Sequence, residues 1–584
     1  MDAGVAWMQV VSGRCDDIVF SPNGINAYII GNGTGYRVST DGGVTFTLNG
    51  EINIGIKNHI AICRNSPAIL YISVSTMTYT SVFKSTNSGL NFAKVGLGTN
   101  FDGGGQALYD FYIHVNPSDP DNAYIGLASI WRTTDGGISF QNISYSVPNI
   151  MHTGQNNMDF NPVNSNELIA VNSGGVWKST DRGSSWINLN GSLTLTQFHN
   201  IAADPLNVNH IIGGTQDNGT QQTFGTLNYT AAFGSHGGEV CFHAVNPQYI
   251  IGETQINSIE YSTNGGSSWQ SGNSGLTGYG SWIGPIISHP AAPGVYYTAR
   301  QRVHISTDWG ASWTPISSGT EGTIMELAIS KTDPNIMYAT WGNNIYKSTD
   351  AGVTFTNVSS GLPQRVITSV YVHPDSSDVA VLSFSGFGEG KIYKTTNGAS
   401  SWLNISGNLP DSPANDVLIY YPNAATSILF AATDVGVFFT DNYGASWIEL
   451  SDGLPNTVAM HLDYHSATNM LRIGTFGRGI WETPNPIGVI NYNNEIPSAY
   501  SLSQNYPNPF NPLTIIKYQV SSPGFVKLAV YDMLGRELKA IVNEDQNAGT
   551  YTVQFDGTGL SSGTYFYRLA ANNYTETKKM ILVK

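Results

Sequence analysis

The sequence predicts an all-β protein, built mainly from repeated four-stranded units and ending in a small β-sandwich. Three observations support this prediction. An eight-residue pattern recurs along most of the 584 residues. Short alternating apolar runs are bounded by Gly, Pro and Asn, which is the signature of strands and turns. Charged residues make up only 11% of the chain, against roughly 25% in an average soluble domain.

The recurring pattern is clearest at Ser179–Trp186, which reads Ser-x-Asp-x-Gly-x-x-Trp. Copies follow one another at a period of roughly 40 to 48 residues, which indicates a repeat array or a propeller. Residues 2–7 form the end of a further copy. The other complete copies are Ser39–Phe46, Ser85–Phe92, Thr133–Phe140, Ser262–Trp269, Ser306–Trp313, Ser348–Phe355, Thr395–Trp402 and Thr440–Trp447.

The chemistry of the pattern is that of a tight turn. Asp and Asn side chains accept hydrogen bonds from nearby backbone N–H groups, and Gly adopts positive φ without steric cost. The acidic position is Asn in four copies, a change that a turn acceptor tolerates and a catalytic or metal-binding carboxylate does not. We therefore expect structural roles for Asp41, Asn87, Asp135, Asp181, Asn264, Asp308, Asp350, Asn397 and Asn442.

This pattern resembles the Asp-box (BNR) repeat of sortilins, sialidases and two-propeller xyloglucanases. The resemblance covers residues 1 to about 483. It implies four-stranded propeller blades in which each box joins the third strand to the fourth. It says little about activity, because unrelated functions share the repeat.

The spacing of the boxes suggests how the blades are divided. The gap from Trp186 to Trp269 is twice the usual length, so we expect a degenerate box near Gly214–Gly219. If the strand after Trp186 closes the last blade, residues 184–483 form a seven-bladed propeller, and residues 1–183 form part of an N-terminal one. The alternative is one ring of about ten blades. The chain opens inside a box and without a signal peptide, so we expect both upstream blades and a signal peptide to be missing.

The least repetitive stretch, residues 149–268, holds the candidate ligand-binding residues. Its order of segments resembles a family of secreted bacterial Asp-box proteins of unsettled function. That family usually has His-x-Asp-x-x-His first and Gly-Asp-Gly-Gly last, whereas this chain has Gln155 and Asn156 in the first segment and Ser235-His236 in the last. A degenerate turn is the alternative for the middle segment. The candidates are His152, Gln155, Asn156, Gln216, Asp217, Asn218, His236 and Glu239.

Tryptophan faces can stack on sugars, and six tryptophans lie outside the boxes. We expect most of them to fill space between blades. They are Trp131, Trp177, Trp282, Trp309, Trp341 and Trp481.

The C-terminal part differs from the repeats. Residues 484–499 form a linker rich in Asn and Pro, and residues 500–584 alternate as strands of a sandwich. The words Tyr506–Pro512, Tyr531–Arg536 and Gly563–Leu569, with the Lys-rich end, resemble the type A C-terminal sorting domain of type IX secretion. The resemblance implies a Gram-negative bacterium, recognition by the secretion machinery, and a secreted or surface-attached protein. Cleavage near the linker would follow.

Bulk properties exclude several classes of function. A net charge of −15 without a basic cluster argues against nucleic acid as a partner. No apolar run is long enough to span a membrane. The cysteines Cys15, Cys63 and Cys241 form neither a metal motif nor a disulfide framework, and we expect no metal and no cofactor.

Two hypotheses of function remain open. The first is a non-catalytic propeller that binds a glycan or an extracellular protein. The second is a glycoside hydrolase of the two-propeller xyloglucanase type, which uses two carboxylates facing across a cleft. No motif in the sequence names such a pair, so the first hypothesis is preferred and the catalytic residues are unknown.

Overall fold

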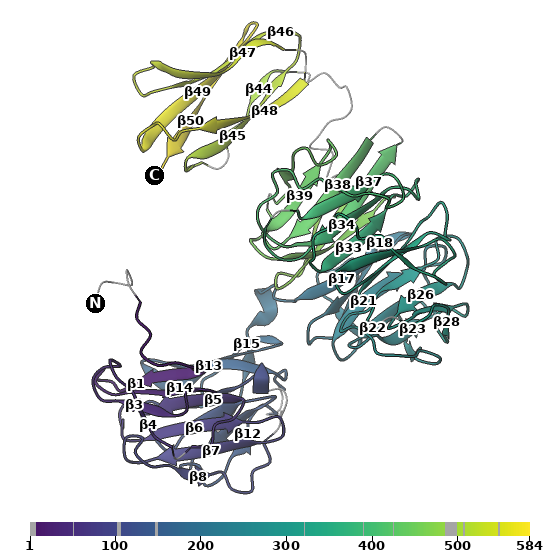
Figure 1. Ribbon diagram of the computed structural model, residues 1–584. Coiled ribbons are helices and arrows are strands. Elements are labelled where there is room, and N and C mark those ends of the chain that lie inside the picture. The colour runs from purple at the N-terminus through teal and green to yellow at the C-terminus, as the bar shows by residue number, and fades with distance from the viewer. Residues whose placement is uncertain are drawn as a thin grey trace. The chain divides into compact units, whose positions relative to one another are not determined.

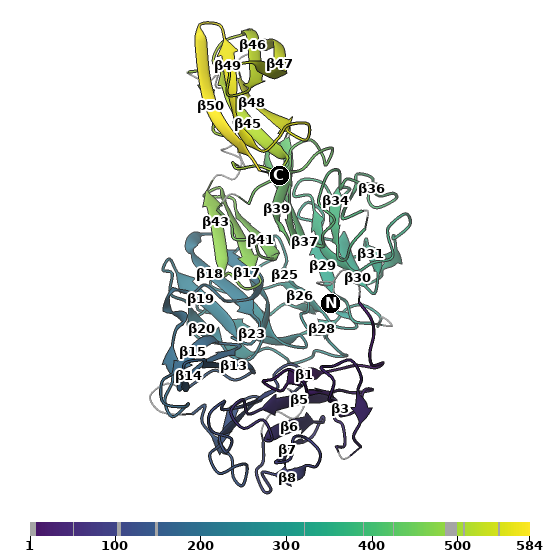
Figure 2. The same ribbon diagram turned by 90° about the vertical axis from the view of Figure 1, so that its left-hand side faces the viewer.

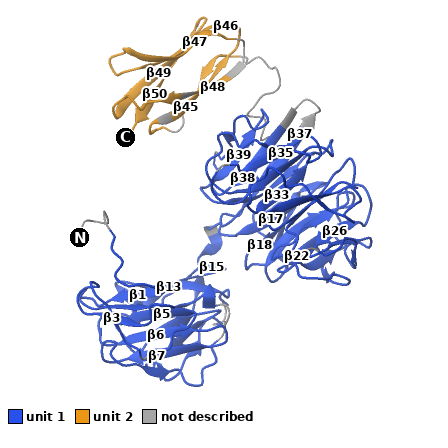
Figure 3. Ribbon diagram, viewed as in Figure 1, with its two compact units in different colours: residues 1–484 blue, residues 485–584 orange. Residues whose placement is uncertain are grey.

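The structure is a computed structural model. It describes residues 7–50, 52–101, 107–145, 150–319, 322–388, 390–423, 426–451, 453–484, 499–505, 508–546 and 549–583. The chain forms two compact units, Met1–Pro484 and Asn485–Lys584, which Figure 3 colours separately. Regular structure is almost entirely β-strand, as predicted. Most of the predicted linker, 484–499, lies outside the described residues.

Four antiparallel sheets of four strands come first in the larger unit, and their first strands contact one another in the order β1, β5, β9, β13 (Figure 1). The strands are β1 (Asp17–Phe20), β2 (Ala27–Ile30), β3 (Arg37–Ser39), β4 (Thr47–Leu48), β5 (Lys57–Ile62), β6 (Leu70–Ser75), β7 (Thr80–Ser85), β8 (Ala93–Val95), β9 (Tyr112–Val115), β10 (Ala123–Gly126), β11 (Ile130–Thr133), β12 (Gln141–Asn142), β13 (Gln155–Asn161), β14 (Asn164–Asn172), β15 (Gly175–Ser179) and β16 (Ile187–Asn188). A short 3-10 helix, η2 (Asn190–Ser192), follows.

Seven more sheets follow in the same unit, six with four strands and the last with three (Figure 2). Their strands are β17 (Phe198–Asp204), β18 (Asn207–Thr215), β19 (Thr220–Phe224), β20 (Thr230–Phe233), β21 (Gly237–Phe242), β22 (Ile250–Thr254), β23 (Ser258–Ser262), β24 (Gln270–Ser271), β25 (Ile286–Ser288), β26 (Tyr296–Ala299), β27 (Val303–Ser306), β28 (Thr314–Pro315), β29 (Glu326–Ile329), β30 (Met337–Trp341), β31 (Asn344–Ser348), β32 (Thr356–Asn357), β33 (Ile367–Val372), β34 (Ala380–Phe384), β35 (Ile392–Thr395), β36 (Leu403–Asn404), β37 (Ala414–Asn423), β38 (Thr426–Thr433), β39 (Gly436–Thr440), β40 (Ile448–Glu449), β41 (Ala459–His465), β42 (Met470–Thr475) and β43 (Ile480–Pro484).

These seven sheets close into a ring. Their first strands contact in succession from β17 to β41, and β41 and β42 contact β17 again. The Thr196 carbonyl accepts hydrogen bonds from the backbone of Gly477 and Gly479. The buried Arg472 donates from Nη2 to the Val208 carbonyl at 2.7 Å, which ties the last sheet to the first. The predicted Asp-box propeller fold with a seven-bladed ring is confirmed, whereas the exact division at 183/184 stays a prediction.

Two faces follow from the strand order. Because successive strands of each sheet are antiparallel, turns between first and second strands and between third and fourth strands lie at one end of the sheet. Turns between second and third strands and the connections from one sheet to the next lie at the other end. We call the first end the box face, because it carries the boxes, and the second the connection face.

The box turn at Ser179–Trp186 has the expected geometry. Asp181 Oδ1 accepts from the Ser179 hydroxyl at 2.8 Å and from the Ser185 backbone at 2.8 Å. Trp186 is 2% exposed, and its Nε1 donates to the Ile143 carbonyl of the preceding sheet at 3.2 Å. At Asn264 the oxygen accepts equivalent bonds, from Ser262 and Ser268. An amide oxygen therefore substitutes for a carboxylate oxygen without changing the turn.

Two expectations about blade boundaries are wrong. Gln216–Gly219 joins β18 to β19, which are second and third strands, so it is not the degenerate box. The box position is the β19–β20 turn, because boxes join third strands to fourth strands. There the Thr223 hydroxyl donates to the Thr226 carbonyl and accepts from the Thr226 N–H. The strand after Trp186, β16, pairs with β15 and does not close the last blade. A tight box turn leads its fourth strand directly back to the third.

The smaller unit is a sandwich of two sheets, ordered β44-β45-β48 and β47-β46-β49-β50. Its core includes Phe510, Tyr518, Leu528, Tyr567 and Leu569. The β47 edge strand was not predicted from the sequence. Its first four residues are all exposed, so they show no alternation of apolar and polar residues. The strands are β44 (Ser501–Leu502), β45 (Leu513–Val520), β46 (Gly524–Tyr531), β47 (Glu537–Gln546), β48 (Gly549–Asp556), β49 (Gly563–Ala571) and β50 (Tyr574–Leu582).

Candidate ligand-binding cavity

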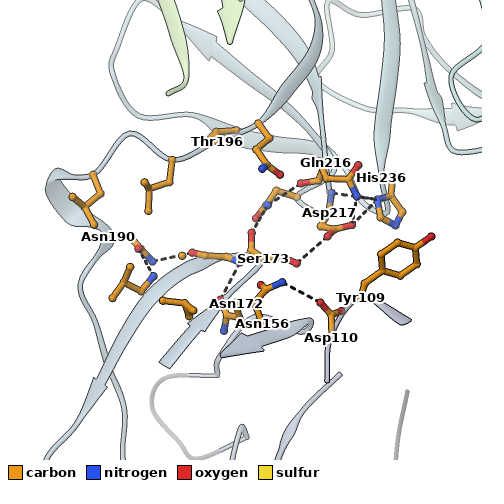
Figure 4. Close-up of a pocket in the computed structure, with 18 of the residues that line it drawn as sticks. Tyr109, Asp110, Asn156, Asn172, Ser173, Asn190, Thr196, Gln216, Asp217 and His236 are labelled. Atoms are coloured by element: carbon orange, nitrogen blue, oxygen red, sulfur yellow. Dashed lines mark hydrogen bonds and ion pairs between the residues drawn. The ribbon is translucent and has the colours of Figure 1, made fainter. Parts of the chain in front are cut away.

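A cavity of about 950 Å³ lies where the connection faces of the fourth sheet and of the ring's first sheets meet (Figure 4). One wall comes from the β8–β9 connection, from β13 and from the β14–β15 turn. The other comes from the β18–β19 turn and from the connections before β21 and β25. The segment between β16 and β17 lines the cavity between them. Its size is in the range of small-molecule binding sites.

The wall before the ring is held by amide side chains. Asn156 Nδ2 donates to Asp110 Oδ1 at 3.2 Å, which joins β13 to the β8–β9 connection. Asn190 donates to the Gly174 carbonyl at 2.9 Å and accepts from the Val176 backbone at 2.8 Å. These bonds fix the β14–β15 turn, a two-residue turn made of Ser173 and Gly174.

The ring wall is organised around Asp217. This residue has φ of 61°, a left-handed conformation that Asp tolerates in turns better than most residues. Its Oδ1 lies 2.7 Å from His236 Nδ1 and accepts from Gln216 Nε2 at 2.8 Å. Gln216 Oε1 in turn lies 3.1 Å from His199 Nε2. The turn side chains are therefore ordered before any ligand arrives.

Two hydrogen bonds join the walls. The Ser173 hydroxyl donates to Asp217 Oδ2 at 2.8 Å, and Asn218 Nδ2 donates to the Ser173 carbonyl at 2.8 Å. Figure 4 shows Ser173 at the point where the two sets of side chains meet. The base of the cavity is thus a continuous polar network.

Aromatic rings provide the apolar surface of the cavity. Tyr109 is 79% exposed and Trp282 is 50% exposed, although both line the cavity. The Trp282 ring lies edge-on to the His236 ring, with ring centroids 5.1 Å apart. A large aromatic face that remains open inside a cavity is available for stacking against a ligand.

The cavity brings together five of the eight candidates chosen from the sequence. Asn156, Gln216, Asp217, Asn218 and His236 all line it. The other three, His152, Gln155 and Glu239, are not among its lining residues. Whether any of the eight binds a ligand stays a prediction.

His152 and Gln155 support the wall from behind. The His152 carbonyl accepts from Gln155 Nε2 at 2.6 Å and from Asn172 Nδ2 at 3.0 Å. Gln155 is fully buried, so it cannot contact a ligand in the cavity. Both residues position the strand that carries Asn156.

Glu239 lies in the central channel of the ring, near Glu326 and Asp416. Burial raises the pKa of Glu239, and the negative charges of Glu326 and Glu253 raise it further. Burial likewise raises the pKa of Glu253 to about 8. These carboxyls are therefore held toward the neutral form, as is expected for like charges in a low-dielectric interior.

The sequence reading missed several lining residues. Tyr109, Asp110, Ser173 and Asn190 carry no pattern that distinguishes them, because they lie in ordinary turns and connections. Trp282 was visible as a tryptophan outside the boxes, but nothing placed it at a cavity. The signal in the sequence that could have identified Trp282 was its position in a connection between two sheets. A tryptophan in a connection is less often needed to fill the space between blades than one in a strand or a box.

Within the described ranges, no group of three or more His, Cys, Asp or Glu residues is arranged to hold a metal ion. No helix among those residues is long and apolar enough to cross a membrane.

Two family models match parts of the chain. The model for a secretion system C-terminal sorting domain matches residues 504–584, and the model for sortilin, neurotensin receptor 3, matches residues 343–470. The chain is an Asp-box β-propeller protein with a type IX secretion sorting domain. The sorting domain implies interaction with the type IX secretion system, and with it a secreted or outer-surface protein. No curated protein matches the chain.

Two solved structures are similar to the chain, and the first of them supports the fold. The GH74 xyloglucanase from Xanthomonas campestris is 19% identical with a TM-score of 0.54, over 80% of this chain and 73% of that chain. The GH74 enzyme from Niastella koreensis is also 19% identical, with a TM-score of 0.28, over 81% and 90%. At this level of identity the likeness to the first structure concerns the fold alone.

Proposed function

We propose that this secreted propeller binds a neutral polysaccharide in the cavity around Asp217, without cleaving it. The observation that carries the proposal is the pair of open aromatic rings, Tyr109 and Trp282, in a cavity whose polar lining is mostly side-chain amides, together with Asp110, Asp217 and His236. The C–H face of a sugar ring carries partial positive charge and matches the negative face of an aromatic ring.

Amide groups supply the polar side of the proposed recognition. Among the described residues, Oδ1 of Asn156 and Oδ1 of Asn218 take no hydrogen bond from the protein, while their Nδ2 atoms are engaged. These oxygens are able to accept from sugar hydroxyls. A net charge of −15 disfavours a polyanionic glycan, so the expected ligand is uncharged.

The experiment is binding of the full chain to immobilised neutral polysaccharides, including β-glucan, xyloglucan, mannan and galactan. Trp282→Ala and Tyr109→Ala should each weaken binding by up to roughly tenfold, since an aromatic stacking contact contributes up to about 1.5 kcal/mol and about 1.4 kcal/mol corresponds to a factor of ten. Tyr443→Ala is the matched control, because Tyr443 is 55% exposed but lies in a box turn on the box face. Equal binding by all three variants and the parent would contradict the proposal.

A second candidate function is glycoside hydrolysis, because Asp110 and Asp217 line the same cavity from opposite walls. One observation weakens this candidate. Both carboxylate oxygens of Asp217 are engaged within the protein, Oδ1 with His236 and Oδ2 with Ser173, which favours a role in holding the cavity walls together over a role in attacking a sugar. Release of reducing ends from a β-glucan that is lost in both Asp110→Asn and Asp217→Asn would support hydrolysis over simple binding.

A further inference from the structure

A second feature of the connection face lies across the ring from Asp217. The turn between β34 and β35 spans residues 385–391, whereas the corresponding turns of the other ring sheets have two to four residues. This sheet is the fifth of the seven, so the ring separates it from the first sheet, which carries Asp217. The long turn reads Ser-Gly-Phe-Gly-Glu-Gly-Lys.

Charged side chains hold the described residues of this turn, which exclude Glu389. Lys391 Nζ donates to the Gly386 carbonyl at 2.7 Å and to Asp411 Oδ1 at 2.9 Å. The same Asp411 oxygen accepts from the Gly388 backbone at 2.6 Å. Arg365 donates from Nη1 to the Phe387 carbonyl at 2.9 Å and from Nη2 to the Gly390 carbonyl.

The cation of this support is buried, whereas its carboxylate partner is exposed. The Lys391 side chain is only 4% exposed, while its partner Asp411 is 65% exposed. A buried ammonium group is destabilising unless it is paired and hydrogen-bonded, so the turn and Asp411 together satisfy it. Gly386, Gly388 and Gly390 all have positive φ, between 79° and 97°. Residues other than Gly adopt such φ values only with steric strain.

This anchored turn presents an exposed aromatic ring. Phe387 is 72% exposed, and Lys391 Nζ lies 5.8 Å from its ring centroid. The Phe387 side chain buries little apolar surface, so it contributes little to the hydrophobic core. The hydrogen bonds that hold the turn are therefore not explained by a need to bury Phe387. With 72% of the side chain exposed, most of the Phe387 ring is accessible to a ligand.

A cavity of about 470 Å³ lies beside the turn. Gly388 and Lys391 line it together with Asn404, Leu409 and Asp411. It therefore combines a carboxylate, a side-chain amide and an apolar edge. The exposed Phe387 is not itself a lining residue, but it directly precedes the lining residue Gly388 in the turn. These are the groups that recognise a single sugar ring, with hydroxyls bonded at one edge and the C–H face stacked on the aromatic.

We propose that Phe387, Asp411 and Asn404 form a second binding site, for one or two sugar units of a neutral oligosaccharide. Asp411 Oδ2 accepts from one hydroxyl and Asn404 Nδ2 donates to the next, because Oδ1 of each side chain already accepts hydrogen bonds within the protein. Phe387 stacks on the sugar ring. The site is independent of the cavity around Asp217. When both are occupied by one polysaccharide chain, the two sites raise the apparent affinity through effective concentration.

The test uses the full chain carrying Trp282→Ala, so that the first cavity is weakened. The probes are gluco-, xylo-, manno- and galacto-tetrasaccharides, and the readout is saturation transfer from protein to sugar by NMR. We expect at least one tetrasaccharide to bind, and adding Phe387→Ala to weaken it roughly tenfold, which is the equivalent of one stacking contact. Phe387→Trp should retain binding, because it keeps an aromatic face.

The matched control is Tyr443→Ala in the same background. Tyr443 is also an exposed aromatic with a lysine beside it, Lys394 Nζ at 4.5 Å from the ring, but it belongs to the box face. Thermal melts check that each variant is folded. The proposal is overturned if Phe387→Ala binds every sugar as Tyr443→Ala does, or if no tetrasaccharide binds in the Trp282→Ala background. The first cavity is judged separately, by Trp282→Ala alone on polysaccharide.

Discussion

The hydroxyl of Ser173 donates to Oδ2 of Asp217 across 2.8 Å and so links the β14–β15 turn to the β18–β19 turn. One residue precedes the seven-bladed ring and the other belongs to its first sheet. The same carboxylate holds His236 through its other oxygen. Asp217 is therefore the residue through which both walls of the cavity are fixed relative to each other.

Removing either partner of this contact tests how strongly the walls are coupled. Ser173→Ala should destabilise the protein by about 1 kcal/mol, as is typical for one hydrogen bond at a partly exposed site. In the Asp217→Ala background the same change should have almost no effect, because its partner is already absent. Urea unfolding of the four proteins measures the coupling. Strictly additive effects would show that the contact contributes nothing.

The box carboxyls are predicted to be turn acceptors. Asp181→Asn should cost well under the roughly 1 kcal/mol of a lost cap-type hydrogen bond, since Asn264 makes the same bonds in its own box. Trp186→Ala should cost about 3–5 kcal/mol, because the ring is almost completely buried between two sheets. Thermal melts of the two variants compare them. A large loss for Asp181→Asn, accompanied by release of a bound metal, would contradict the structural role.

A buried histidine predicts how stability depends on pH. Burial, assisted by the charges of Arg300 and Arg302, lowers the pKa of His304 to about 4. The ring is neutral in the fold, with Nδ1 2.9 Å from the Arg302 carbonyl and Nε2 accepting from the Thr277 backbone at 3.1 Å. The unfolded chain binds the proton more readily, so His304 favours folding above pH 6.5, and this contribution is lost as pH falls toward about 4.

The measurement is the denaturation midpoint of the parent and of His304→Gln between pH 4 and pH 7.5. Glutamine keeps a donor and an acceptor but does not titrate in this range. The parent should therefore lose more stability than the variant as pH falls. Parallel curves would show that His304 is not the group responsible, and other buried histidines such as His243, whose pKa burial also lowers, would need the same comparison.

The blades could be predicted well from the sequence because each box turn is formed by residues that are close together in the chain. Ser179, Asp181 and Gly183 are close in the chain, and their turn forms from neighbouring backbone groups. The degenerate blade was misread for the same reason. Gln216–Gly219 has good turn residues, but a turn of this kind suits any two antiparallel strands and does not reveal which pair it joins.

The cavity was only partly predictable. Gln216, Asp217 and His236 stood out because their stretch departs from the repeat, and they are adjacent in the fold. Ser173 and Tyr109 lie far from them in the sequence and meet them only because the fourth sheet packs its connection face against the ring. Contacts of that kind depend on how whole sheets are placed, and no local pattern specifies them.

The sorting domain should be needed for export and dispensable for the propeller. The sandwich has its own core, and β49 is an inner strand of its four-stranded sheet, between β46 and β50. Deleting 563–584 removes β49 and β50 and with them Tyr567, Leu569 and Met580, which are fully buried. In a host with type IX secretion, and with a signal peptide added, the shortened protein should remain in the periplasm.

The matched comparison is the intact chain with the same signal peptide, which should appear outside the cell with its last domain removed. A chain that ends near residue 486 should show the same main thermal transition as the intact protein, because the sandwich has a hydrophobic core of its own. This control separates failure of export from failure of folding. Export of the shortened protein, or an extracellular form that retains Lys584, would show that these residues are not the processed export signal.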